Sequence, residues 1–171
     1  MTRLLDQDKV RYGSGSMPIF QRFYRKYQDA SNPILKQVYR VLYRIFCKMN
    51  HIEIVSGTNI GGGLYIGHPY CITINPKAVI GKNCNIHKGV TIGQENRGKR
   101  EGVPTIGDCV WIGINSTIVG RISVGNDVLI APNTYVNCDV PPHSVVFGNP
   151  CIIKAKDNAT DQYINNRIDN A

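Results

Sequence analysis

The chain has 171 residues, and its 20 Lys and Arg against 12 Asp and Glu give a formal net charge of +8. An apolar fraction of 42% with a charged fraction of 19% allows one packed domain and excludes wholesale disorder. No run approaches the roughly 18 apolar residues that span a bilayer. Met1 to Val10 carries Asp6 and Asp8, unlike a secretory signal. Six cysteines are scattered without a CxxC pair, so we expect them to be reduced in a cytoplasmic protein.

The positive charge is concentrated at one end of the chain. Residues 1–50 hold 10 Lys and Arg against 3 acids, whereas residues 51–171 hold 10 against 9. The body therefore lacks the broad basic face of nucleic-acid-binding proteins, and we expect no nucleic-acid partner.

Two segments precede the body. We expect residues 1–16 to be flexible, because residues 13–16 have linker composition. Residues 17–50 are predicted to form basic amphipathic helices, the second beginning at Asn32 as N-cap with Pro33 at the first position. Its apolar stripe comprises Ile34, Leu35, Val38, Leu42, Ile45, Phe46 and Met49, and its basic face comprises Lys36, Arg40, Arg44 and Lys48. A basic face is most often only solvated. Peripheral attraction to a membrane surface, or to an anionic substrate, is the alternative.

From Ile54 onward, Ile or Val recurs every six positions, with two breaks in the series. The anchors are Ile54, Ile60, Ile66, Ile72, then Ile74, Ile80, Ile86, Ile92, then Ile106, Ile112, Ile118, Val124, Ile130 and Val136. A second inward candidate lies four residues after most anchors, from Thr58, Leu64 and Tyr70 through to Val140. A period of six fits neither a helix nor an alternating strand. It predicts a short strand and a tight turn on each side of a three-sided coil, stacked into a parallel β-helix of four to five coils.

These hexads resemble those of the hexapeptide-repeat acyltransferases. The resemblance covers about Glu53 to Lys156 and implies a mainly β fold, a left-handed parallel β-helix with a short N-terminal α-helical segment. We place the β-helix at residues 51–156 and a C-terminal tail at residues 157–171.

The first break in the series lies between Gly67 and Cys71. One coil and the slip of two residues place Lys88 next to His68, with His87 adjacent. The second break, residues 94–104, is predicted to be a protruding loop. Its Arg97, Lys99 and Arg100 suit an anionic ligand, and we expect the loop to lie beside His68 and to help choose the acceptor. An ordinary solvated loop is the alternative.

The segment from Ile60 to His68 resembles the catalytic stretch of serine acetyltransferases and of related sugar O-acetyltransferases. This resemblance implies that His68 is the general base and that a carboxylate 15 residues earlier, here Glu53, orients it. The chemistry suits the residue types. An alcohol must lose its proton while it attacks a thioester, and neutral imidazole can accept that proton near pH 7. We expect direct transfer in a ternary complex, with a covalent route through Cys71 as the alternative.

The family binds acetyl-CoA, without a metal, in a groove between subunits of a trimer. Carried over by position, Gly113, Ile114, Ala131 and Pro132 would line this acyl donor, and Lys154 would approach a phosphate. His87, Lys88, Arg97 and Arg100 are the candidates for contacting the acceptor.

The acceptor is less defined than the donor. Serine acetyltransferases carry an Arg-His pair 34 and 35 residues after the base, where this chain has Gly102 and Val103. The sequence therefore favours a saccharide hydroxyl, as in capsule or exopolysaccharide biosynthesis, with L-serine as the alternative. Two further alternatives are a non-catalytic β-helix scaffold and a carbonic anhydrase on the same prism, although the four histidines lack the spacing of its zinc ligands.

Overall fold

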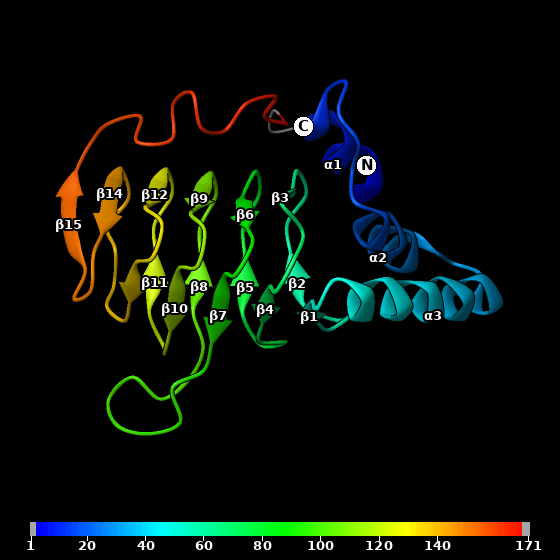
Figure 1. Cartoon of the computed structure of the whole chain (residues 1–171), viewed down its shortest axis with the longest axis horizontal. Helices are drawn as coiled ribbons and strands as arrows, with labels where there is room; N and C mark the ends of the chain where they lie inside the picture. The colour runs from blue at the N-terminus through cyan, green and yellow to red at the C-terminus, as the bar shows by residue number, and fades with distance from the viewer. Residues whose placement is uncertain (1–2, 169–171) are drawn as a thin grey trace.

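The computed structural model describes residues 3–168, which form a helical unit at one end of a three-sided β-helix (Figure 1). The helices are α1 (Leu4–Tyr12), α2 (Ile19–Asp29) and α3 (Pro33–Met49). Asn32 caps α3 as expected, because its side chain accepts hydrogen bonds from the N–H groups of Ile34 and Leu35. Among the described residues, no helix is both long and apolar enough to cross a membrane.

Each coil of the prism contributes strands to three sheets, named here A, B and C. Sheet A contains, in spatial order, β1 (Glu53–Ile54), β4 (Thr73–Ile74), β7 (Thr91–Gly93), β10 (Thr117–Val119) and β13 (Tyr135–Val136). Sheet B contains β2 (Asn59–Ile60), β5 (Val79–Ile80), β8 (Thr105–Ile106) and β11 (Ser123–Val124). Sheet C contains β3 (Tyr65–Gly67), β6 (Asn85–His87), β9 (Val110–Ile112), β12 (Val128–Ile130), β14 (Ser144–Phe147) and the antiparallel β15 (Ile152–Ala155).

The predicted anchors form the core of the prism. Parallel pairing stacks them in three columns, one behind each sheet: Ile54, Ile74, Ile92, Ile118 and Val136; Ile60, Ile80, Ile106 and Val124; Ile66, Ile86, Ile112 and Ile130. All of these side chains are buried. The columns exclude water continuously along the axis, and this burial stabilises a stack of strands only two to four residues long.

The first break in the hexads is an insertion of two residues, His68 and Pro69. Strand β3 pairs with β6 at a separation of 20 residues, but β4 pairs with β7 at a separation of 18. The backbone N–H of Lys88 bonds to the carbonyl of Gly67, and that of Gly89 to the carbonyl of Tyr70, so the two residues between Gly67 and Tyr70 have no counterpart in the next coil.

This insertion corrects the assignment of Tyr70. Tyr70 was expected inside the prism, but it is exposed, and Ile72 occupies the corresponding inward position instead. Ile72 stacks below Val90, because the Glu53 N–H bonds to the Ile72 carbonyl and the Thr73 N–H bonds to the Val90 carbonyl.

The expectation of a flexible segment over residues 1–16 is wrong for Leu4–Tyr12, which is helix α1. Asp8 on α1 is fully buried and forms an ion pair with Arg25 of α2, at 2.7 Å between carboxylate oxygen and Nε. The prediction of flexibility rests on the composition of residues 13–16. It misses the helix because the sequence does not show that Asp8 and Arg25 are buried together.

The helical unit caps the open end of the β-helix. Arg25 donates to the carbonyls of Ile60 and Gly61, and Asp8 accepts from the Leu64 N–H. Tyr12 accepts from the Ile66 N–H through its hydroxyl oxygen. The first coil would otherwise expose unpaired backbone groups, which invite edge-to-edge association. Part of the positive charge near the N-terminus is therefore structural.

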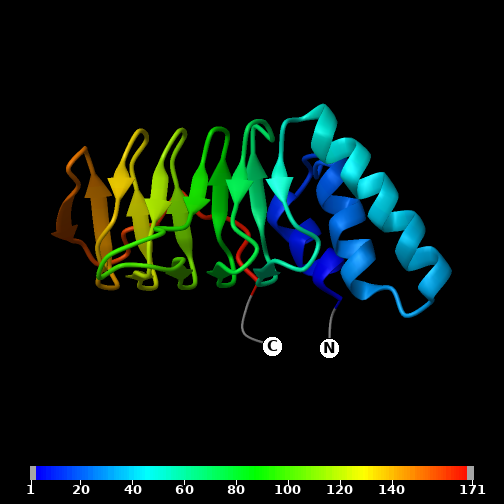
Figure 2. The same cartoon turned by 90° about the horizontal axis from the view of Figure 1, so that it is seen from below.

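The C-terminal tail is also ordered against the prism, and we call residues 157–168 the strap (Figure 1, orange to red). Asp127 accepts hydrogen bonds from the N–H groups of Ala159 and Thr160 and from the Thr160 hydroxyl. Further along, the Asn85 amide donates to the Tyr163 carbonyl, and the Arg11 guanidinium of α1 donates to the Asn165 carbonyl. The strap thus runs back along the prism to the helical unit (Figure 2).

Candidate active site

His68 protrudes from the corner of the prism that connects sheet C to sheet A. The two-residue insertion displaces it from the regular coil, it adopts a φ of 54°, and it is exposed. A histidine in the regular repeat would be confined by the coils above and below. The insertion therefore presents His68 to solvent, at the head of an edge that runs along the later coils.

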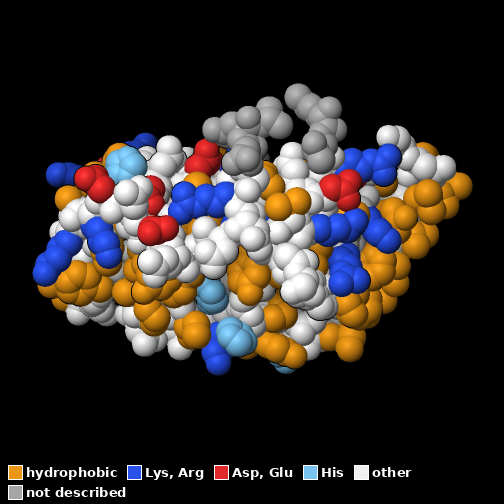
Figure 3. All heavy atoms as spheres, turned by 90° about the horizontal axis from the view of Figure 1, so that it is seen from above, with side chains coloured by type: hydrophobic (Ala, Val, Ile, Leu, Met, Phe, Trp, Pro, Cys, Tyr) orange, Lys and Arg blue, Asp and Glu red, His pale blue; other side chains and the backbone are white. Residues whose placement is uncertain are grey.

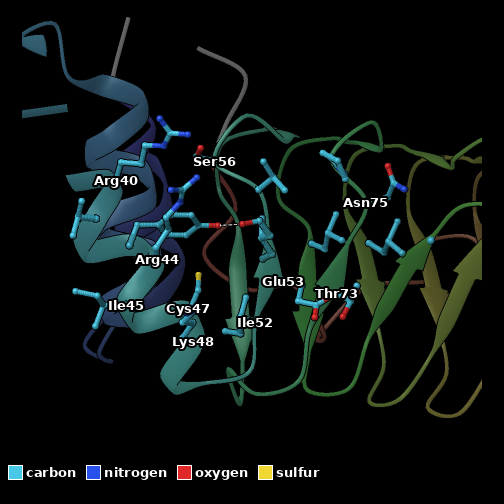
Figure 4. Close-up of a pocket in the computed structure, with 18 residues that line it drawn as sticks. Arg40, Arg44, Ile45, Cys47, Lys48, Ile52, Glu53, Ser56, Thr73 and Asn75 are labelled. Atoms are coloured by element: carbon cyan, nitrogen blue, oxygen red, sulfur yellow. Dashed lines mark hydrogen bonds between the residues drawn. The ribbon is translucent and has the colours of Figure 1, made fainter. Parts of the chain in front are cut away.

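Glu53 lies on β1 and is also exposed. It pairs in register with Thr73, the residue at which the chain enters sheet A after the insertion. Glu53 and His68 thus flank the same corner, but the described structure shows no hydrogen bond between them. Glu53 also belongs to a groove of about 820 Å³ between α3 and the outer face of sheet A (Figure 4).

His87 is held more tightly than His68. Its Nδ1 lies 2.7 Å from the carbonyl oxygen of Ile112, which fixes Nδ1 as the donor and leaves Nε2 unprotonated when the ring is neutral. Burial lowers the pKa of His87, the bond to Ile112 opposes this, and nearby His68 lowers it further. The ring also packs against Trp111 at 4.6 Å between centroids. His87 is thus an imidazole held in one orientation beside the candidate base, with its pKa below the usual value.

Gly67 makes room for this ring. A Cβ on Gly67 would lie 2.5 Å from Cδ2 of His87, closer than carbon atoms can approach. The sequence indicated His87 as a neighbour of His68 but not its anchoring to Ile112. Only the register of β6 with β9 shows that contact.

Four candidate donor-binding residues and the acceptor candidate Lys88 share the corner of His68. The donor candidates Gly113, Ile114, Ala131 and Pro132 lie with Lys88 in turns between sheets C and A on successive coils. The Asn115 N–H bonds to the Lys88 carbonyl at 3.0 Å, and the Asn133 N–H bonds to the Ile114 carbonyl at 2.9 Å. These residues form one continuous edge that begins at His68. Lys154 lies at its far end on β15, with its ammonium 5.6 Å from the ring centroid of Phe147.

The loop of residues 94–104 is predicted from the sequence to lie beside His68, and this prediction is wrong. It leaves the prism between β7 and β8, at the corner connecting sheets A and B (Figure 1). His68 follows β3 at the corner connecting sheets C and A, so sheet A separates the loop from His68 within one chain. The loop folds along its own corner, where the Arg121 N–H donates to the Arg100 carbonyl and Glu95 pairs with Gly102. Arg97 and Arg100 are exposed on it. The error arose because the length of an insertion does not reveal which corner carries it.

Cys71, the alternative nucleophile, is exposed at the His68 corner, whereas Cys47 and Cys84 are buried and every cysteine is free. The described residues contain no group of three side chains able to hold a metal ion.

The comparisons with known proteins agree with this architecture. Residues 104–138 match the bacterial transferase hexapeptide family (six repeats). A serine acetyltransferase of Helicobacter pylori is 35% identical over 118 residues, which is 69% of this chain and 69% of the relative. The chain belongs to the hexapeptide-repeat acyltransferase family. This membership confirms the predicted fold class, a left-handed parallel β-helix with few helices, and makes the chain an acyltransferase.

Other acyltransferases of the family cover the chain to different extents. Serine acetyltransferase 2 of Arabidopsis thaliana is 38% identical over 99 residues, 58% of this chain but only 31% of the relative. A serine acetyltransferase of Neisseria gonorrhoeae, solved with serine, has a TM-score of 0.67 at 27% identity, covering 89% of this chain and 68% of that structure. A serine acetyltransferase solved with CoA has a TM-score of 0.65 at 27% identity and covers 79% of this chain and 55% of that structure. The chain spans only part of these proteins.

Proposed function

We propose that this acyltransferase transfers an acetyl group from acetyl-CoA to a hydroxyl, with His68 as the general base. The main support for His68 as the base is the two-residue insertion, which places an exposed imidazole at the start of a continuous edge of turns. The edge continues over successive coils, as a site for an extended donor requires, and the similarity to a protein solved with CoA supports that donor.

In the proposed reaction, His68 removes the hydroxyl proton as the oxygen attacks the thioester carbonyl. The tetrahedral intermediate then collapses, the C–S bond breaks, and the imidazolium returns the proton to the departing CoA sulfur. Backbone N–H groups of neighbouring turns would stabilise the oxyanion. The carboxylate of Glu53 would stabilise the imidazolium once the two side chains turn toward each other.

The acceptor that we propose first is L-serine, because the similar proteins are named serine acetyltransferases. A saccharide hydroxyl is the second candidate. Gly102 and Val103 stand where that family carries an Arg-His pair, and neither side chain can pair with an amino-acid carboxylate.

We also propose a cytoplasmic homotrimer that shares its active sites between copies. Within one chain, sheet A separates the loop of Arg97 and Arg100 from His68, so a neighbouring copy is needed to bring a loop to the base. Light scattering should give three times the 19.0 kDa chain mass. A monomer that still turns over would contradict shared sites.

One experiment tests the reaction and the acceptor together. The purified protein is incubated with acetyl-CoA and L-serine, free sugars or nucleotide sugars, and the release of free thiol is followed. His68→Ala should lower turnover about 10²- to 10⁴-fold, and Glu53→Gln should lower it less because Glu53 transfers no proton. His143→Ala, an exposed histidine at another corner, is the matched control. Turnover by His68→Ala near that of the control would exclude His68 as the base, and a non-catalytic scaffold would release no thiol with any acceptor.

A further inference from the structure

Helix α3 exposes a continuous apolar stripe to solvent, and two of its members, Val41 and Ile45, also line the groove between α3 and sheet A. We define the α3 outer face as Ile34, Val38, Val41, Ile45 and Met49. The solvent-exposed fractions of these residues are 46–74%. Their spacing of three and four residues places them on one side of the helix. Surface helices normally turn such a stripe toward the core.

The core-facing side of α3 uses different residues. Tyr43 and Cys47 are buried, and Phe46 stacks on Phe23 of α2 at 5.7 Å between ring centroids. The helix is thus already anchored through its aromatic side, and no described residue covers the outer face. This corrects the expectation of a single apolar stripe, because the predicted set combined residues from both sides. Figure 2 shows α3 as the outermost element of the helical end.

The charge beside this face has one sign. Helix α3 contains Lys36, Arg40, Arg44 and Lys48 and no acidic residue. Arg44 and Lys48 are exposed directly along one flank of the stripe. In the space-filling view, the hydrophobic side chains form a band along the α3 end beside Lys and Arg (Figure 3).

This charge distribution discriminates between possible occupants. Two copies of α3 packed through their outer faces would bring rows of positive charge together without a compensating acid. A surface of anionic lipid headgroups offers opposite charge to the flank, together with an acyl boundary for the apolar stripe. A helix of 17 residues is about 25 Å long and can lie in the headgroup plane over its whole length.

We propose that the α3 outer face binds an anionic lipid surface, with Arg44 and Lys48 reaching the headgroups. The apolar side chains enter the interface while the long basic side chains extend toward the phosphates. The membrane is contacted peripherally, and the prism with its His68 edge stays in water. This inference concerns residues that have no assigned role in the proposed reaction, although Val41 and Ile45 line the same groove as Glu53.

The test is co-sedimentation of the full chain with vesicles of phosphatidylcholine alone or with one quarter phosphatidylglycerol. We expect binding only to the anionic vesicles, and its loss at 1 M salt, where the screening length falls to about 3 Å. Arg44→Gln and Lys48→Gln should each weaken binding about fivefold. Val41→Gln with Ile45→Gln should weaken it roughly tenfold or more.

The matched control is Ile152→Gln with Lys156→Gln, an exposed apolar residue and a nearby cation at the opposite end of the prism. This control should bind vesicles like the parent chain. Equal binding to neutral and anionic vesicles, or binding unchanged by the α3 substitutions, would overturn the proposal. Failure of the parent chain to bind, with a smaller oligomer for Val41→Gln with Ile45→Gln by light scattering, would show instead that copies of the chain cover this face.

Discussion

Removing one partner of the buried ion pair between Asp8 and Arg25 should destabilise the chain strongly. Both side chains are fully inaccessible to solvent, and Arg25 Nε lies 2.7 Å from the Asp8 carboxylate. The same carboxylate accepts from the Gln21 amide at 2.8 Å and from the Leu64 N–H at 2.9 Å. Asp8→Ala would leave the Arg25 charge buried without its carboxylate and would remove the acceptor of the Leu64 N–H and one of the two acceptors of the Gln21 amide. Removing one partner of a buried pair costs about 3–5 kcal/mol.

For a domain of this size, each kcal/mol lowers the midpoint of thermal unfolding by about 2–4 °C. Asp8→Ala should therefore unfold about 6–20 °C below the parent chain in a thermal scan followed by circular dichroism. Asp6→Ala is the matched control, because Asp6 forms an exposed ion pair with Lys9 on the same helix at 3.0 Å. Exposed pairs contribute only about 0–1 kcal/mol. If the two variants unfolded within 2 °C of each other, the capping role of Asp8 would be refuted.

Three further outcomes are expected. Asp127→Ala removes the acceptor for Thr160 and Ala159, so limited proteolysis within the strap should accelerate about tenfold or more while the prism stays resistant. Burial raises the pKa of Asp127, but hydrogen bonds from Thr160 and His143 outweigh this and hold it below its usual value. The stabilisation of the strap by Asp127 should therefore be complete above the unfolded pKa near 3.9 and be lost as the pH falls through the lower folded pKa. Hydrogen exchange of Asp127→Asn should lack this dependence. Gly67→Ala should displace the His87 ring, lower the free energy of unfolding by about 1–3 kcal/mol and reduce the rate of thiol release. The control Gly57→Ala adds a Cβ that meets nothing within 4 Å, and it should leave both quantities unchanged.

The sequence predicts the prism well because the Ile and Val residues of its core recur every six positions. Each Ile or Val of the hexads meets another from the coils beside it, so a one-dimensional period determines the three-dimensional columns. The same reasoning places the turns after sheet C in line with His68.

Contacts without a period escaped prediction. The burial of Asp8 depends on a partner 17 residues away on another helix and on the free edge of the first coil. That a solenoid end needs a cap could be anticipated, but not which charged residues would form it. The insertion at His68 and Pro69 was visible as a slip, although only the hydrogen bonds locate it. The loop of residues 94–104 was correctly recognised as extra and assigned to the wrong corner.

The strap has a consequence for the order in which the chain can finish folding. Repeat arrays usually assemble progressively from one end, with each unit needing only its neighbour. Here, the Arg11 side chain of the first helix bonds to the carbonyl of Asn165, and it also donates to Gly63 and Asn85 at the start of the prism. This junction cannot close until residue 165 has been synthesised. In a chain emerging from the ribosome, the helical unit should therefore lack its contacts with the strap until the strap residues are made. Once they form, these contacts link the first helix to the C-terminal strap, and the array should then unfold as a single unit.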